Sequence, residues 1–195
     1  LTKRIEKITK YDRRKQNLAD EIRRVEESDE FNKEKIIENL EKKDTIGKVN
    51  FDSVIIFAFD ETLKSITTSL IYTDVTPKKI YFITLNQWFD ESLLSEDSSQ
   101  NLYFPSINKK NFDEFKKEYF EKYSSEPNQI SLLGFDLVGL IFYLSRENNF
   151  QLNSKIFDQK STFKGKIGLF EIEDKRIKHV LNLYKVENNK FKKIF

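Results

Sequence analysis

Residues 51–88 carry the sequence FDSVIIFAFDETLKSITTSLIYTDVTPKKIYFITLNQW, in which two apolar runs flank an amphipathic segment. The first run, Ser53–Phe59, is rich in β-branched and aromatic residues without polar alternation, which predicts a strand buried on both faces. Asp60 is placed to cap a helix whose apolar residues recur at helical spacing: Leu63, Ile66, Leu70 and Ile71. The second run, Lys79–Leu85, predicts another buried strand.

The order strand, helix, strand predicts a β-α-β unit. Two parallel strands joined by one helix imply an α/β sheet with a right-handed crossover. In such sheets, ligands bind beyond the carboxyl ends of the strands. We therefore expect ligand-binding residues at the ends of these two strands: Phe59, Asp60, Glu61, Asn86, Gln87 and Trp88.

Composition limits the classes of protein to consider. The 195 residues are 38% hydrophobic and 14% aromatic, enough for one core or two small lobes. The net charge of +2 favours neither nucleic acid nor an anionic membrane as a partner. There is no Cys, which excludes disulfides and thiolate chemistry, and no apolar run of about 18 residues, from which we expect no membrane span. Because the chain begins at Leu1, we also expect a processed or truncated product.

The first 43 residues predict two helices. The first would bury one apolar stripe: Ile5, Ile8, Leu18, Ile22 and Val25. The second, near residues 32–43, would bury Phe31, Ile36, Ile37 and Leu40. Acidic residues alternate with the many basic ones here, so we interpret the charges as a solvated helix surface and not as a phosphate-binding face.

The second half predicts two more helices and a β-rich tail. A helix over 108–123 has aromatic residues at spacings of three and four, and a helix over 129–147 is apolar nearly all round, so another surface must cover it. Residues 163–172 alternate and carry turn glycines, and strands near 180–186 and 191–195 flank a turn. A short antiparallel addition should therefore close the chain.

No motif indicates a catalytic or metal centre. His179 is the only His, it lies among basic residues, and we expect it at the surface. The sequence has no nucleophile elbow, no G-x-G-x-x-G loop and no Walker A loop, so no cofactor is implied. Acidic pairs such as Asp90-Glu91 and Asp113-Glu114 leave an acid-residue hydrolase as an open alternative.

Four segments in a fixed order resemble the type I periplasmic binding proteins, the leucine/isoleucine/valine-binding-like receptors. FDSVIIFAF and IYFITLNQW resemble two consecutive strands of their second lobe. The helix pair and the hairpin resemble the family at these positions: Phe115, Tyr119, Tyr123, Pro127, Gly134, Phe135, Asp136, Phe163, Gly165, Gly168, Phe170 and Asp174. The chain departs from the family pattern at Leu137, which stands for Ala, and at Lys175, which stands for the terminal Gly of the hairpin.

The resemblance implies a Rossmann-like α/β lobe with a parallel sheet flanked by helices, followed by a short C-terminal β-hairpin. Residues 1–105 and 149–195 would form lobe two, and residues 106–148 would be the helix pair that belongs to lobe one. The rest of lobe one would lie outside this chain. That lobe, or a second copy, would then cover the helix over 129–147.

Within this family, Tyr11-Asp12-Arg13 and Trp88-Phe89-Asp90 resemble the penicillin-binding protein activators. This branch implies a non-catalytic periplasmic protein, lipid-anchored through a segment outside this chain, that contacts a cell-wall synthase. The alternative is the solute-binding protein of an ABC transporter for amino acids, in which Asp60 or Glu61 would meet an ammonium group and Trp88 would stack on the ligand.

Overall fold

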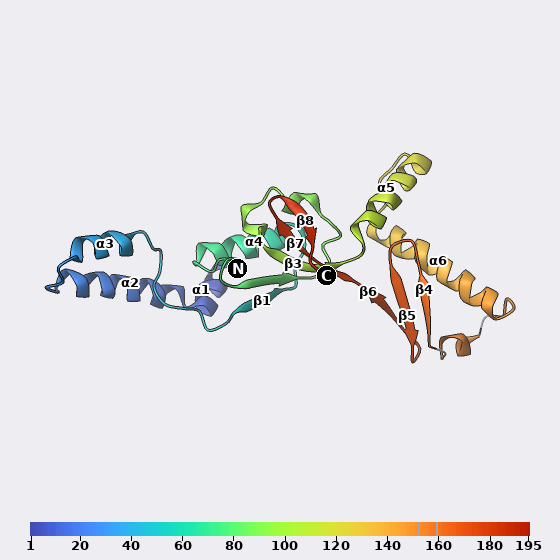
Figure 1. The fold of residues 1–195 in the computed structure, drawn as a ribbon, viewed down its shortest axis with the longest axis horizontal. Coiled ribbons are helices and arrows are strands. Elements are labelled where there is room, and N and C mark those ends of the chain that lie inside the picture. The colour runs from blue at the N-terminus through green and yellow to red at the C-terminus, as the bar shows by residue number, and fades with distance from the viewer. Residues whose placement is uncertain (152, 159) are drawn as a thin grey trace. The chain divides into compact units, whose positions relative to one another are not determined.

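The structure is a computed structural model that describes residues 1–151, 153–158 and 160–195 (Figure 1). The chain forms two compact units. Unit 1 comprises Leu1–Leu85, Glu91–Tyr103 and Lys185–Phe191. Unit 2 comprises Asn86–Asp90, Phe104–Tyr184 and Lys192–Phe195.

Unit 1 begins with three helices where the sequence predicts two: α1 (Thr2–Thr9), α2 (Tyr11–Glu26) and α3 (Lys33–Glu41). Lys10 separates α1 from α2, because its left-handed backbone (φ 53°) ends the first helix. The helices α2 and α3 pack through a small core of Leu18, Val25 and Leu40 with Ile22, Ile36, Ile37 and Ile46. Two expected core residues are exposed instead, Ile8 at 62% and Phe31 at 100%.

The β-α-β unit is present as predicted. Strand β1 (Ser53–Ile56) leads through α4 (Asp60–Tyr72) into β2 (Tyr81–Thr84), and the two strands pair in parallel with Ile56 opposite Thr84. Strand β2 pairs in parallel with β3 (Leu102–Ser106). The loop between β2 and β3 carries two short 3₁₀ helices, η1 (Glu91–Leu93) and η2 (Asp97–Ser99).

The sheet continues with two C-terminal strands in the order β1-β2-β3-β7-β8. Strands β7 (Asn182–Glu187) and β8 (Lys190–Lys193) are joined by Asn188 and Asn189, both with positive φ, which suits a tight hairpin turn. This confirms the predicted α/β fold with a C-terminal hairpin.

The expectation that the first strand is buried on both faces is wrong. Strand β1 ends at Ile56 and lies at the edge of the sheet. Its inner side chain Ile56 is 3% exposed, but Ile55 and Phe57 are 61% and 75% exposed. No described residue covers that outer face, which leaves an apolar strand half open.

Unit 2 packs a long helix on a second sheet. Strands β4 (Ser161–Lys164), β5 (Leu169–Glu173) and β6 (Arg176–Val180) form an antiparallel sheet. Helices α5 (Lys109–Tyr123) and α6 (Gln129–Glu147) precede it, with the 3₁₀ helix η3 (Ser154–Phe157) between. A core cluster joins α6 to the sheet: Leu140, Leu144 and Ile172 with Tyr143, Phe157 and Phe163.

Helix α6 matches the predicted bounds and remains largely uncovered. Its buried stripe recurs every four residues: Leu132, Asp136, Leu140 and Leu144. Seven apolar side chains on its other faces are 41% exposed or more: Ile130, Leu133, Phe135, Leu137, Val138, Ile141 and Phe142. Helix α6 is long and apolar enough to cross a membrane by length and composition alone, whereas the sequence analysis expects no membrane span. Asp136, however, is 2% exposed within α6 and binds the backbone of the β4–β5 turn, which favours packing on protein.

The expectation that His179 lies at the surface is also wrong. It lies on β6 and is half-buried, with its ring stacked on Phe170 at a centroid distance of 4.3 Å. Burial lowers the pKa of its imidazole below the usual 6.5, against a smaller opposite effect of the Asp136 carboxylate. The basic residues around His179 in the sequence hide this position, because its burial comes from Phe170 on the paired strand β5.

Candidate functional site

The carboxyl ends of β1 and β2 lie beside each other in unit 1. Ile56 is opposite Thr84, and the Thr84 hydroxyl donates a hydrogen bond to the Ile56 carbonyl at 2.8 Å. Parallel strands bring their carboxyl ends to one edge of a sheet, which is where α/β proteins bind ligands. The predicted site residues follow these two strand ends in sequence. Residues 59–61 belong to unit 1, and residues 86–88 belong to unit 2.

The first group opens helix α4 and faces solvent. Phe59 is 46% exposed, and Asp60 and Glu61 are exposed as well. Glu61 forms an ion pair with Lys64 at 2.9 Å, one turn further along the helix. Asp60 makes no ion pair or side-chain hydrogen bond with any described residue, so its carboxylate is free to meet a cation.

Asp60 does not cap α4, contrary to expectation. The residue before the helix is Phe59, and no side chain caps the first turn. Asp60 is instead the first helical residue and has a positive φ of 49°, a conformation that is uncommon for residues other than Gly and Asn. The acidic pair Asp60-Glu61 still lies in the first turn, where the helix dipole favours negative charge.

The second group forms a tight turn after β2. The Asn86 side-chain oxygen accepts hydrogen bonds from the Trp88 backbone N–H at 2.9 Å and from the Ser106 hydroxyl at 2.7 Å. This arrangement is an Asx turn, in which the Asn side chain satisfies the backbone two residues later. Gln87 is 4% exposed and Trp88 is half-buried. The Asn86 side-chain oxygen therefore already accepts two hydrogen bonds within the protein. The half-buried indole of Trp88 remains as a group on which a ligand could stack.

Backbone strain accompanies this turn. Trp88 and Phe89 both have positive φ, 49° and 56°, and two consecutive residues of this size in that region are rare. Phe89 is 4% exposed and packs edge-on against Tyr184 at 4.9 Å between centroids. The burial of Phe89 stabilises the turn against the strain.

Tyr184 connects the aromatic cluster around Phe89 to helix α5. Its hydroxyl accepts a hydrogen bond from the Lys109 backbone N–H at 3.0 Å. Burial raises the pKa of the Tyr184 phenol, and the hydrogen bond from Lys109 partly opposes that shift. The Lys109 ammonium lies 5.3 Å from the Phe89 ring centroid. These contacts fix the start of α5 next to the turn.

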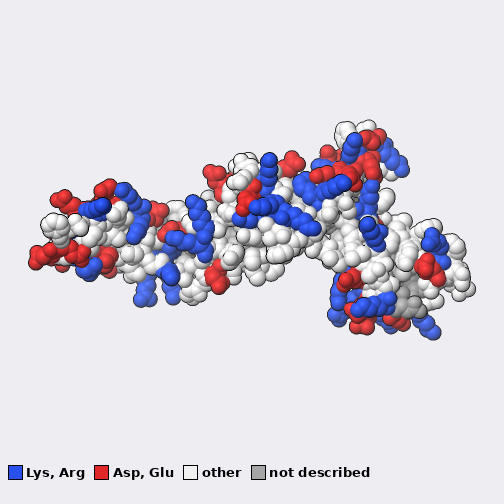
Figure 2. All heavy atoms as spheres, viewed as in Figure 1, with Lys and Arg blue, Asp and Glu red and all other residues white. Residues whose placement is uncertain are grey.

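The first group offers the exposed Phe59 ring and the unpaired Asp60 carboxylate, and the second group offers the half-buried indole of Trp88. Within the described residues, no group of three or more His, Asp and Glu side chains could hold a metal ion. Figure 2 shows positive and negative side chains interleaved over the face in view, as the sequence indicates.

Sequence reasoning missed one functional candidate, Arg14. It lies in the charged run YDRRK, which we interpreted as solvated surface, yet it is 6% exposed. Helical spacing indicates that Arg14 is buried, because it lies three residues after Tyr11 and four before Leu18, on the buried stripe of α2.

Known proteins of the same fold appear among solved structures. No protein-family model matches the chain, and no curated protein matches it. A leucine-binding protein, LivK, from Thermotoga maritima aligns with a TM-score of 0.52 and 15% identity, over 86% of this chain and 48% of that one. An extracellular ligand-binding receptor from Desulfohalobium retbaense aligns with a TM-score of 0.51 and 17% identity, over 73% of this chain and 26% of that one. The chain has the fold of a type I periplasmic binding protein.

The receptor fold is thus confirmed. The C-terminal domain of LpoA from Haemophilus influenzae, described as a regulator of PBP1A, aligns with a TM-score of only 0.44 and 9% identity. That similarity is too low to argue for the activator branch. This chain spans between 26% and 48% of the length of the two receptors aligned above.

Proposed function

We propose that this chain is part of a non-catalytic, extracytoplasmic protein of the receptor fold that acts by binding a partner protein. The observation that carries this proposal is the aromatic surface at the end of β1. Phe57 is 75% exposed and Phe59 is 46% exposed, followed directly by Asp60. A receptor for a free amino acid would need polar partners for both the ammonium and the carboxylate, because buried charges must be paired. Exposed aromatic side chains instead suit the core of a protein interface.

The partner class follows from the resemblance to the penicillin-binding protein activators. That resemblance rests on Tyr11-Asp12-Arg13 and on the Trp88-Phe89-Asp90 turn. We propose a cell-wall synthase, a penicillin-binding protein, as the partner, and regulation of peptidoglycan synthesis as the outcome of the contact. A lipid anchor outside this chain would fit the same branch.

The domain assignment is part of this proposal. Residues 106–148 would belong to lobe one, and residues 1–105 and 149–195 to lobe two. The uncovered faces of α6 support it, because seven exposed apolar residues on one helix form a surface that a soluble protein normally buries. The first lobe of a two-lobed receptor would supply that cover.

The experiment is a binding measurement with a purified penicillin-binding protein immobilised on a sensor surface. Substituting Phe57→Ser and Phe59→Ser together should weaken binding by at least about tenfold, since interface aromatics carry much of the binding energy. Phe31→Ser is the matched control, because Phe31 is fully exposed in the same unit. Equal affinity of both variants would contradict the proposal.

A second candidate is an amino-acid-binding protein of an ABC transporter. The free, exposed carboxylate of Asp60 at the strand end favours it, since it could meet a ligand ammonium. Calorimetric titration of the intact protein against amino acids tests this alternative. Micromolar binding that Asp60→Ala abolishes would place the transport function ahead of the partner-protein function. The hydrolase alternative has no supporting observation, and the aligned receptors are described as binding proteins.

A further inference from the structure

Unit 1 contains a pocket at the amino ends of β1 and β2, whereas the predicted ligand-binding residues follow the carboxyl ends of these strands. It has a volume of about 610 Å³ and is formed by three pieces: Arg14 of α2, the segment 43–52 that leads into β1, and the turn 74–80 that leads into β2. No part of the proposed function uses this pocket.

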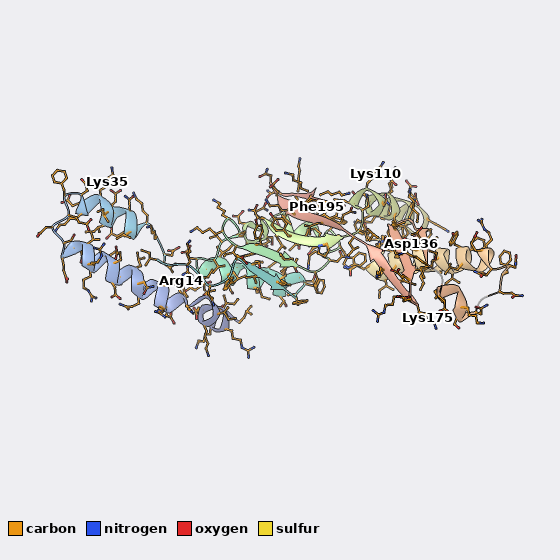
Figure 3. All side chains as sticks on the ribbon, turned by 60° about the horizontal axis from the view of Figure 1, so that its bottom comes forward. Arg14, Lys35, Lys110, Asp136, Lys175 and Phe195 are labelled. Atoms are coloured by element: carbon orange, nitrogen blue, oxygen red, sulfur yellow. The ribbon has the colours of Figure 1, made fainter. Side chains whose placement is uncertain are left out.

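Arg14, which Figure 3 labels, bonds to both loops that form the pocket. Its guanidinium donates to the Thr73 carbonyl at 2.9 Å and to the Thr45 hydroxyl at 2.7 Å, and it lies 3.2 Å from an Asp74 carboxylate oxygen. The Thr45 hydroxyl also donates to Asp74 at 2.6 Å. Arg14 and Asp74 therefore neutralise each other while they fix two loops against α2.

The floor and the rim of the pocket differ in chemistry. Val75 and Ile80 are buried at 1% and 8% exposure and form an apolar floor. Three lysines line the rim and are exposed: Lys43, Lys48 and Lys79. Among the described residues, none of these three lysines forms an ion pair or a side-chain hydrogen bond.

The lining of the pocket carries an excess of positive charge, with four basic residues against two acidic ones. With Arg14 and Asp74 paired, the remaining charged residues of the lining are the three lysines and Asp52. The Asp52 carboxylate, which lines the same pocket, accepts a hydrogen bond from the Ser53 hydroxyl at 3.2 Å. An excess of positive charge beside a low-dielectric wall raises the local concentration of anions.

We propose that this pocket binds a small organic anion with an apolar body and a carboxylate or phosphate head. The apolar floor would take the body, and the rim lysines would take the head as point charges. The pocket is preorganised, because Arg14 fixes its two loops without occupying the rim. Arg14 is a positioning residue here, and the lysines are the binding residues.

The test is a titration of the full chain, labelled with ¹⁵N, with two probes: phenyl phosphate and benzoate. Both carry an aromatic body, so a preference between them identifies the head group. We expect saturable shifts of the backbone amides of Gly47, Val75 and Ile80. The triple substitution Lys43→Gln, Lys48→Gln and Lys79→Gln should lower the affinity for the tighter-binding probe by about tenfold or more, because it removes three charges close to the anionic head group.

The matched control is Lys3→Gln, Lys7→Gln and Lys35→Gln. These lysines are exposed in the same unit, lie outside the pocket and form no ion pair within the described residues. This control should change affinity by less than about twofold, since surface charges at a distance are screened. Val49→Trp, which adds bulk to the pocket lining and keeps every charge, should also abolish the shifts. Equal losses in the two triple variants, or no saturable shift with either probe, would overturn the proposal.

Discussion

The carboxylate of Asp136, deep in helix α6, accepts a hydrogen bond from the backbone N–H of Ile167 at 2.9 Å. The same carboxylate accepts a hydrogen bond from the Lys166 backbone N–H at 2.6 Å. One side chain thus satisfies two backbone donors of the β4–β5 turn, which no strand partner could reach. The helix and the hairpin are held together by this contact as well as by their apolar cluster.

Replacing Asp136 should therefore destabilise unit 2. Asp136→Ala leaves two N–H groups of the turn without an acceptor, and we expect a loss of about 3 kcal/mol in the free energy of unfolding. Urea denaturation measures it. Asp113→Ala is the control, because Asp113 is an exposed carboxylate on α5 paired with Lys109, and its loss should cost about 0.5 kcal/mol or less. Similar losses in both variants would contradict a structural role for Asp136.

Gly165 should not tolerate a side chain. A Cβ added there would collide with the Asp136 carboxylate, whereas a Cβ added at Gly134 would meet nothing within 4 Å. Gly165→Ala should lower the midpoint of thermal unfolding, while Gly134→Ala should raise stability by about 0.5–1 kcal/mol, since Ala favours a helix interior. If both substitutions are equally tolerated, the close approach of the turn to α6 is incorrect.

Lys175 occupies a turn position that suits Gly. It connects β5 to β6 with a φ of 61°, and the family pattern has Gly at this point of the hairpin. Because a left-handed backbone costs a residue with a Cβ about 1 kcal/mol, Lys175→Gly should stabilise the protein by up to that amount. Lys178→Gly, within β6, should destabilise it in the same urea series. A destabilising Lys175→Gly would show that the Lys side chain contributes more than the turn strain costs.

His179 should make stability depend on pH in one direction. Burial holds its pKa below 6.5, so the unfolded chain binds more protons than the folded chain as the pH falls below that value. The free energy of unfolding should therefore decrease as pH is lowered through 6.5 towards the folded pKa. His179→Phe keeps the stacking on Phe170 and removes the proton. Its unfolding free energy, measured by urea between pH 7.5 and 5.5, should fall less than that of the parent chain; an identical pH profile in both would contradict this assignment.

Local sequence patterns predicted most of the elements. The α6 helix appears at the predicted bounds of 129–147, and the parallel pairing of β1 with β2 follows from the spacing of two apolar runs around one helix. Turn chemistry predicted the β7–β8 hairpin, because Asn tolerates positive φ. These features depend on short-range propensity and periodicity, which a single sequence contains.

Burial of particular side chains was less accessible. The charged neighbours of Arg14 and of His179 predict surface positions for both residues, and both predictions are wrong. Both positions are decided by contacts with another element: Arg14 by Thr73 and Asp74, about sixty residues away, and His179 by Phe170 on the paired strand of the same hairpin. Composition near a residue does not report which distant element packs on it.

The residues at the strand ends illustrate the same division. The sequence by itself determined that Phe51–Trp88 forms a β-α-β unit, because two short apolar runs typical of strands flank a segment with helical apolar spacing. It also determined that Asp60 and Trp88 follow the carboxyl ends of two strands. Only the tertiary structure decided that Asn86 is held by Trp88 and Ser106, that Phe57 remains exposed, and that Arg14 frames a lysine-rimmed pocket. The physical reason is that hydrogen-bond satisfaction and exposure depend on which surfaces meet, and that information lies in contacts between segments far apart in the chain.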